Sequence, residues 1–161
     1  MLSPSTLRSP EVLLATGLGV GFLPRAPGTW GSVAAVLIWW FVLAELPVSQ
    51  QLVISGCYFL AGWWCSHRIA QRYGVEDAGQ IVADEIVGMW LALAFLPQVW
   101  WLALLAFIVF RWLDIVKPSL IGWLDREVKG GLGVMLDDLV AGVIAGSSLL
   151  VCYTAVQVLL S

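Results

Sequence analysis

Charged side chains are scarce in this chain, and their scarcity limits the classes of protein to which it can belong. Asp, Glu, Lys and Arg make up 12% of the 161 residues, about half of the roughly 25% that is typical of soluble domains. Hydrophobic residues make up 60%, and ten residues are Trp. A soluble fold of this size could not cover so much apolar surface, so we expect one domain, residues 1–161, embedded in a bilayer. Only eight residues are Lys or Arg and the net charge is −3, which argues against nucleic-acid binding.

Histidine and cysteine are also rare, and their positions exclude several kinds of catalytic site. The one histidine, His67, is interpreted as a surface residue, and a lone histidine argues against zinc. Cys57, Cys65 and Cys152 lie inside apolar runs, and we interpret them as small buried hydrophobic residues. No cysteine has an Arg six residues later, and no Asp-x-Asp pair occurs. Catalysis by a Cys-x5-Arg loop and catalysis through an aspartyl phosphate are therefore both excluded.

Long apolar runs predict an all-α protein, a multi-pass membrane bundle of about five helices. A spanning helix needs about 20 apolar residues, or somewhat fewer when flanking side chains reach the interface. The expected membrane helices cover residues 31–46, 51–69, 81–96, 99–116 and 139–160. We also expect a short helix that begins at Ser9-Pro10-Glu11 and a short amphipathic, interfacial helix in residues 120–129. The glycines of residues 130–133 are interpreted as a flexible link.

All basic residues fall on one side of the membrane in this five-helix arrangement. They are Arg8, Arg25, Arg68, Arg72, Arg111, Lys117, Arg126 and Lys129. Because cytoplasmic loops are enriched in Lys and Arg, we predict that this side faces the cytoplasm, with the N-terminus inside and the C-terminus outside. In the last helix, Gly142 and Gly146 have the spacing of small residues that permits close helix packing.

Five carboxylates stand at the ends of the predicted membrane helices, where charge is costly. They are Asp84, Glu85, Asp114, Asp137 and Asp138. A charge within a membrane segment costs about 2.5–3.5 kcal/mol on insertion scales, so these acids need partners. Arg111 and Lys117 flank Asp114 at spacings of three and share its helix face, so some acids could be structural ion pairs. The surplus negative charge favours a hard cation such as Mg²⁺, because all the ligands are oxygens.

The segment from Leu23 to Ser32 has the composition of a phosphate-binding loop that leads into a helix. Two prolines stiffen it, Gly28 and Gly31 permit close approach of the backbone to a ligand, and Thr29 and Ser32 offer hydroxyl groups. Free amides at a helix N-terminus bind phosphate well. An ordinary capped turn would use the same residues, so both interpretations stay open.

Three blocks of sequence match one known family in order and spacing, from about residue 12 to about residue 146. The blocks are Gly21-Phe22-Leu23-Pro24 with Pro27-Gly28-Thr29-Trp30-Gly31-Ser32, then Asp84-Glu85-Ile86-Val87-Gly88-Met89-Trp90, then Phe110-Arg111-x-x-Asp114 through Lys117-Pro118 and Asp125-Arg126 to Gly130-Gly131-Leu132-Gly133-Val134-Met135-Leu136-Asp137-Asp138. With these blocks the chain resembles the phosphatidylglycerophosphatase A family. The resemblance implies a Mg²⁺-dependent phosphatase of the bacterial inner membrane that converts phosphatidylglycerophosphate to phosphatidylglycerol and phosphate in phospholipid biosynthesis.

Beside this resemblance, each candidate residue receives a role in metal-assisted attack by water. Asp84, Glu85, Asp114, Asp137 and Asp138 would hold one or two Mg²⁺ ions. A carboxylate that does not bind metal, Glu85 or Asp138, would act as the base, while Lys117 and Arg111 neutralise phosphate charge. The residues expected to bind the substrate phosphate are Arg25, Gly28, Thr29, Gly31, Ser32 and Arg126. The alternatives are a small transporter, which would show polar residues deep along several helices, and a purely structural membrane subunit.

Overall fold

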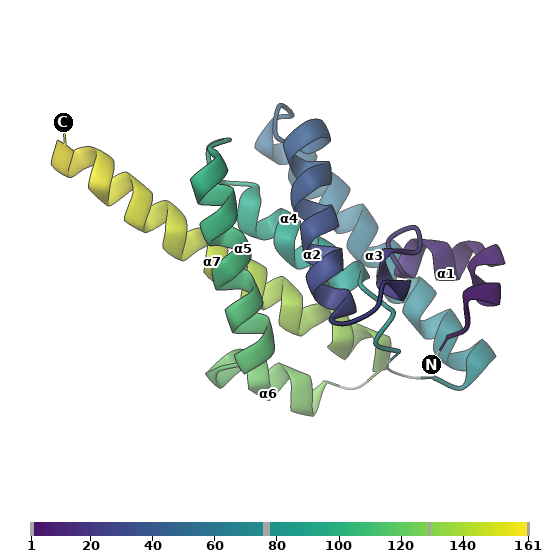
Figure 1. Ribbon diagram of the computed structural model, residues 1–161. Coiled ribbons are helices and arrows are strands. Elements are labelled where there is room, and N and C mark those ends of the chain that lie inside the picture. The colour runs from purple at the N-terminus through teal and green to yellow at the C-terminus, as the bar shows by residue number, and fades with distance from the viewer. Residues whose placement is uncertain (1, 76–77, 129, 161) are drawn as a thin grey trace.

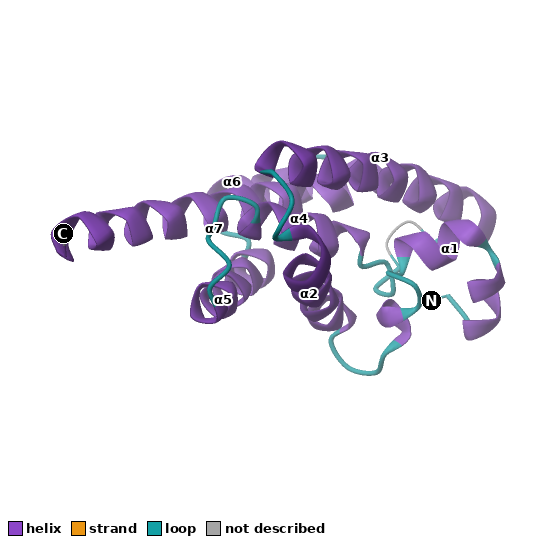
Figure 2. Cartoon of the chain, turned by 90° about the horizontal axis from the view of Figure 1, so that it is seen from above, coloured by secondary structure: helices purple, strands orange, loops and turns teal. Residues whose placement is uncertain are grey.

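The computed structural model describes residues 2–75, 78–128 and 130–160, and every regular element among them is helical (Figure 2). The α-helices are α1 (Pro10–Ala15), α2 (Pro27–Ile38), α3 (Val48–Tyr73), α4 (Ala83–Leu93), α5 (Trp100–Val116), α6 (Ser119–Glu127) and α7 (Gly130–Leu160). Two 3₁₀ helices, η1 (Pro4–Arg8) and η2 (Val20–Phe22), and one π-helix, η3 (Trp39–Leu43), accompany them. The all-α part of the predicted fold class is confirmed.

Residues with a restricted backbone set several helix boundaries. Pro10 opens α1 directly after Ser9, as expected from the preference for proline at the first helical position. Gly74 ends α3 in the left-handed conformation, with φ of 66°. Lys117 follows the last residue of α5 with φ of 47°, a conformation that costs free energy for a side chain other than glycine. The direction in which Lys117 leaves α5 is therefore held by its surroundings.

Helix α4 lies at the centre of the molecule and contacts α2, α3, α5 and α7 (Figure 1). Most of its residues between Ala83 and Leu93 are buried. The glycines of α7 permit the closest of these contacts, because a Cβ at Gly142 would overlap the Gly88 carbonyl oxygen. A Cβ at Gly146 would likewise stand 2.7 Å from the Ala92 carbonyl oxygen. The predicted close packing at these two glycines is confirmed.

The prediction of about five membrane helices is wrong, because only one helix in the described part of the chain is long and apolar enough to cross a bilayer. That helix is α7, over Gly131–Leu160. Helix α4 has 11 residues and rises about 16 Å, against a hydrocarbon core of about 30 Å. The apolar helix over Pro27–Leu43 is also too short. Helix α3 has 26 residues, but Gln, Ser, His and Arg side chains make it too polar.

Helix α7 begins at Gly130, so residues 130–133 are helical and the predicted flexible link is wrong. A Cβ at Gly133 would overlap the Val128 carbonyl oxygen, which shows how closely the chain folds back between α6 and α7. Helix α6 itself is the short amphipathic helix that the sequence predicts, with Ile121 and Gly122 on its buried face. The C-terminal turns of α7 extend beyond the other helices (Figure 1).

Large apolar side chains cover much of the exposed surface. The exposed tryptophans are Trp30, Trp63, Trp64, Trp100, Trp101, Trp112 and Trp123. Cys65 is buried as predicted, but Cys57 and Cys152 are exposed, so their interpretation as buried residues is wrong. His67 lies at the surface as predicted, where its Nε2 is 3.0 Å from Gln71 Nε2.

Candidate active site

Acidic side chains from four helices surround one polar cavity of about 180 Å³. Helix α4 supplies two acids in its first turn, α5 and α6 supply one each, and α7 supplies two from its N-terminal part. The lining residues are Gly79, Ile81, Asp84, Glu85, Asp114, Lys117, Asp125, Asp137 and Asp138. All five predicted carboxylates are among them, together with the positively charged Lys117, which was predicted to neutralise phosphate charge. The fold therefore brings together residues that are far apart in the sequence.

Asp84, Glu85 and Asp138 form the tightest acidic group, because one carboxylate oxygen of each lies within 4.8 Å of the others. Asp84 is 8% exposed and Asp138 is 3% exposed. Glu85 Oε2 and Asp137 Oδ1 are buried, and neither has a hydrogen-bond donor among the described residues. A buried carboxylate oxygen without a donor costs free energy. The group therefore favours a positively charged ligand or a bound proton.

Burial also changes the proton affinity of the two acids on α4. Burial raises the pKa of Asp84 well above its usual range, and the neighbouring negative charge of Glu85 raises it further. Burial raises the pKa of Glu85 to about 7. A cation bound between these groups would favour their charged forms and lower both pKa values. Without one, the acids of α4 bind protons more readily than exposed acids do.

Lys117 lies between two acids that come from different helices. Its Nζ donates to Asp125 Oδ1 on α6 at 2.5 Å and to Asp137 Oδ2 on α7 at 2.6 Å. Burial lowers the pKa of Lys117, but these two hydrogen bonds outweigh burial and raise the pKa above its ordinary value. The charged Lys117 thus connects the end of α5 to both following helices at the edge of the cavity.

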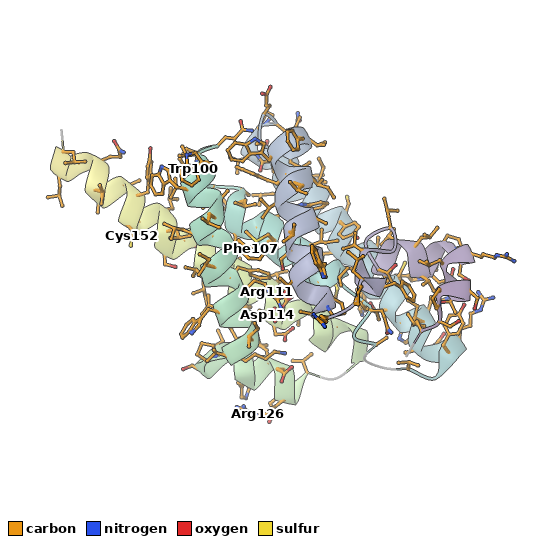
Figure 3. The ribbon with its side chains drawn as sticks, viewed as in Figure 1. Trp100, Phe107, Arg111, Asp114, Arg126 and Cys152 are labelled. Atoms are coloured by element: carbon orange, nitrogen blue, oxygen red, sulfur yellow. The ribbon has the colours of Figure 1, made fainter. Side chains whose placement is uncertain are left out.

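Arg111 stands on α5, one turn before Asp114 and six residues before Lys117 (Figure 3). Its Nη1 donates to Asp114 Oδ2 and lies 4.0 Å from Glu85 Oε1. Its Nε is buried and has no acceptor among the described residues. Arg111 therefore offers an unused donor, and its guanidinium group links α5 to the first turn of α4.

The predicted phosphate-binding segment reaches this site through Gly28. A Cβ at Gly28 would stand 3.0 Å from Glu85 Cδ and 3.1 Å from Arg111 Nη1, and it would overlap the nearer Glu85 oxygen. Glycine is therefore required here so that the N-terminal turn of α2 can lie directly against the Glu85 carboxylate and Arg111.

The other residues predicted to bind phosphate do not line the cavity. Ser32 is buried, and its hydroxyl donates to the Gly28 carbonyl oxygen at 2.9 Å, so it is used within α2. Gly31 permits packing against Val82, since an added Cβ would come 2.7 Å from Val82 Cβ. Thr29 is half-buried, Arg25 is exposed, and Arg126 is exposed on α6 (Figure 3). Nothing in the geometry places these side chains at the acids.

Asp125 lines the cavity although the sequence interpretation assigned it no role in binding or catalysis. Asp125 is exposed on α6, and it lies one turn after the fully buried Ile121. Residues four apart share a helix face, so this spacing was the signal that could have found Asp125. With it, the cavity holds six carboxylates.

The fold and the site together define a class of protein. It is an all-helical protein whose carboxylates and basic side chains meet at a small polar cavity. The chain belongs to the phosphatidylglycerophosphatase A family, whose family model matches residues 13–153. It is accordingly an enzyme, a phosphatase. The match covers α2 to α6, much of α7 and every acid of the cavity.

Three bacterial proteins show how similar the relatives are. Phosphatidylglycerophosphatase A of Escherichia coli is 42% identical over 144 residues, which cover 89% of this chain and 83% of that protein. The protein of the same name from Haemophilus influenzae is 39% identical over 145 residues, or 89% of each chain. A Bacteroides thetaiotaomicron protein named "Putative phosphatidylinositol-3-phosphatase" is 39% identical over 150 residues, or 89% of this chain and 91% of that protein. No solved structure matches the chain.

Proposed function

We propose that this protein hydrolyses phosphatidylglycerophosphate to phosphatidylglycerol and phosphate in phospholipid biosynthesis. The observation that carries the proposal is the meeting of acids from α4, α5, α6 and α7 with Lys117 around one polar cavity. The names of the Escherichia coli and Haemophilus influenzae relatives support this substrate. A small polar cavity in a protein with many exposed apolar side chains suits a substrate with a charged phosphate and an apolar body.

The proposed cofactor is Mg²⁺, and the residues of the cavity suit it. The acidic ligands are all carboxylate oxygens, which hard divalent cations prefer, and two buried oxygens, Glu85 Oε2 and Asp137 Oδ1, lack donors. Asp84 and one of the pair Glu85 and Asp138 would hold a first ion, with Asp114 and Asp137 available for a second. When bound, Mg²⁺ would polarise the phosphoryl group and help a water molecule lose a proton.

Basic side chains at the cavity have donors left for the substrate phosphate. Lys117 has three N–H donors and gives two of them to Asp125 and Asp137, which leaves one. Arg111 retains its unpartnered Nε. Both side chains would neutralise the negative charge that develops on the phosphoryl oxygens, an interaction that is strongest in a buried site.

Carboxylates of the same group would transfer the proton of the attacking water. Glu85 or Asp138 would accept it while the water oxygen forms a new bond to phosphorus. The bond between phosphorus and the terminal glycerol oxygen then breaks. That oxygen takes up a proton and becomes the hydroxyl group of phosphatidylglycerol.

Lipid contact is supported by the first half of α3, where polar residues are buried and apolar residues are exposed. Its outward face carries Leu52, Val53 and Leu60, which are 36%, 65% and 58% exposed, whereas its inward face carries the buried Gln51 and Ser55. A water-facing helix shows the opposite arrangement. We therefore propose that the protein is held in the bacterial inner membrane, with α7 as its spanning helix.

The cytoplasmic side is proposed for the active site. All eight Lys and Arg residues precede Gly131 in the sequence, so they lie on one side of a single span formed by α7. Since basic residues near a span are retained in the cytoplasm, the cavity would face the cytoplasm and the C-terminus would lie outside.

Phosphate release from phosphatidylglycerophosphate in detergent tests the proposal. We expect release with Mg²⁺ and its loss in excess chelator. The Asp84→Asn variant should release no phosphate while its helical content and thermal unfolding stay near those of the unaltered protein. Full activity in chelator would reject the metal, and unaltered activity of Asp84→Asn would reject the site. Phosphatidylinositol 3-phosphate is the comparison substrate, because one relative is named for it.

A further inference from the structure

A second cavity, of about 450 Å³, lies in a groove between α2, η3 and α5, and it shares helix α5 with the acidic cavity. Its lining is entirely apolar. The residues are Val33, Val36, Leu37, Trp40, Phe41, Trp100, Ala103, Leu104 and Phe107. We call this cavity the apolar groove.

The apolar groove and the acidic site are both bordered by helix α5. Leu104, Phe107, Arg111 and Asp114 follow one another at spacings of three and four, so they share one face of the helix. Figure 3 shows Trp100, Phe107, Arg111 and Asp114 in this order along α5. Trp100 and Phe107 line the groove, whereas Arg111 and Asp114 stand at the carboxylates. The helix therefore connects an apolar end with a charged end.

Helix α2 provides the same continuity on the opposite wall. Gly28, in its first turn, lies against Glu85 and Arg111. Val33 and Val36, on the following turns, line the apolar groove. A ligand that enters the groove would thus meet the acidic site at its inner end from both walls.

The outer end of the groove is formed by an irregular helix segment. Trp40 and Phe41 belong to the π-helix η3, where the Ala44 N–H donates to the Trp39 carbonyl oxygen. The Trp40 carbonyl oxygen accepts a hydrogen bond of 2.8 Å from Gln98 Nε2, just before α5. Short π segments within helices occur frequently at functional sites. This one widens the helix where the groove is lined and ties it to the start of α5.

We propose that the apolar groove binds one acyl chain of the phospholipid substrate, so that its phosphate enters the acidic cavity. This inference rests on the proposed function. From Trp100 to Arg111 helix α5 rises about 17 Å, close to the hydrocarbon depth of one leaflet, which is half of about 30 Å. An acyl chain that runs from the phosphate along α5 could therefore extend over the length of the groove.

Filling the groove tests this proposal. The Val33→Trp variant should lower kcat/KM for dipalmitoyl phosphatidylglycerophosphate by about tenfold or more, because each methylene kept out of an apolar site is worth roughly fourfold in binding. Its activity on the dihexanoyl substrate should fall less than its activity on the dipalmitoyl substrate. The matched control is Val53→Trp, since Val53 is 65% exposed on α3 and does not line the groove. Leu104→Trp provides a second filling variant on the other wall.

Equal ratios of long-chain to short-chain activity in both filling variants and in Val53→Trp would overturn the acyl groove. Failure of the unaltered protein to release phosphate from either substrate would instead reject the proposed function. A photoreactive group on the acyl chain of phosphatidylglycerol tests the groove without catalysis. In vesicles, the adducts should concentrate in residues 33–41 and 100–107 and decrease in Val33→Trp. Adducts of equal yield on the exposed face of α3 would reject the proposal.

Discussion

Lys117 donates to Asp125 and Asp137 at once, so the removal of its side chain affects charge and position together. We expect Lys117→Ala to lower kcat by about 10²–10³, the loss typical when one donor to a developing negative charge is removed. The Mg²⁺ requirement should persist because the carboxylates are intact. The measurement is kcat across a Mg²⁺ titration, with Arg68→Ala as a control at an exposed cation on α3. Near-normal kcat with tighter Mg²⁺ binding would mean that Lys117 only pairs with acids.

Gly28 is the residue at which the first turn of α2 meets the Glu85 carboxylate. In the Gly28→Ala variant, the new methyl group would displace the Glu85 side chain, and a misplacement of about 1 Å can cost about 10²-fold in rate. We expect kcat to fall by about tenfold to 10²-fold while the thermal unfolding temperature changes little, since the displaced atoms end a flexible side chain. Gly56→Ala is the matched control, because nothing lies within 4 Å of a Cβ there. Equal rates for both variants would remove Gly28 from the site.

At the scale of residues, the meeting of the acids at one site could be predicted from the sequence. The positions of the side chains around Gly28 relative to that site could not. Asp84 and Asp137 were identifiable because charge among apolar residues near a helix end needs a reason, whatever the fold. The composition of the Gly28 segment predicts that a ligand approaches, but it does not show which groups face the ligand. Ser32 hydrogen-bonds within its own helix and Arg25 is exposed, and both facts depend on how α2 is rotated against α4.

At the scale of helices, close contact between α4 and α7 holds the two halves of the acidic group together. Gly142→Ala would place a methyl group against the Gly88 carbonyl oxygen, which belongs to the backbone and cannot turn away. Forced overpacking of this kind typically costs about 1–3 kcal/mol, even though alanine favours the helix. We expect lower thermal stability in detergent and lower activity, since Asp84 and Asp138 would separate. Gly56→Ala should be neutral or stabilising. An equal or higher unfolding temperature for Gly142→Ala would contradict the tight contact.

Helix positions could be read from the sequence more reliably than helix lengths. Apolar runs and prolines placed α3, α4, α5 and α6 close to their observed positions. The same runs gave too many membrane spans because an apolar run includes the turns at its ends, and α4 keeps only 11 helical residues. The glycines of residues 130–133 suggested a flexible link, but this segment is the start of α7, where Gly131 lies against α3 and Gly133 against Val128. Such tertiary contacts are not visible in composition or spacing.

For the molecule as a whole, α7 is both a wall of the active site and the proposed membrane span. Its 31 residues rise about 46 Å, more than the hydrocarbon core of about 30 Å requires. The N-terminal turns, with Asp137 and Asp138, can therefore remain at the cytoplasmic surface while the C-terminal turns cross. This division explains how one helix holds buried acids at one end and exposed apolar side chains such as Val156 and Leu160 at the other.

Reporters of membrane sidedness test this arrangement. A reporter fused after Leu160 should be active outside the cell membrane, and one inserted after Gly74 should be active only inside. Gly74 suits insertion because nothing lies within 4 Å of a Cβ built there and it follows the end of α3. The physical reason for the expected result is that all eight basic residues precede α7, and positive charge near a span is retained in the cytoplasm. Phosphatase activity of each fusion serves as the control that the protein has folded. If both reporters are found on the same side in active fusions, α7 does not cross the membrane, and its apolar C-terminal turns must be covered in another way.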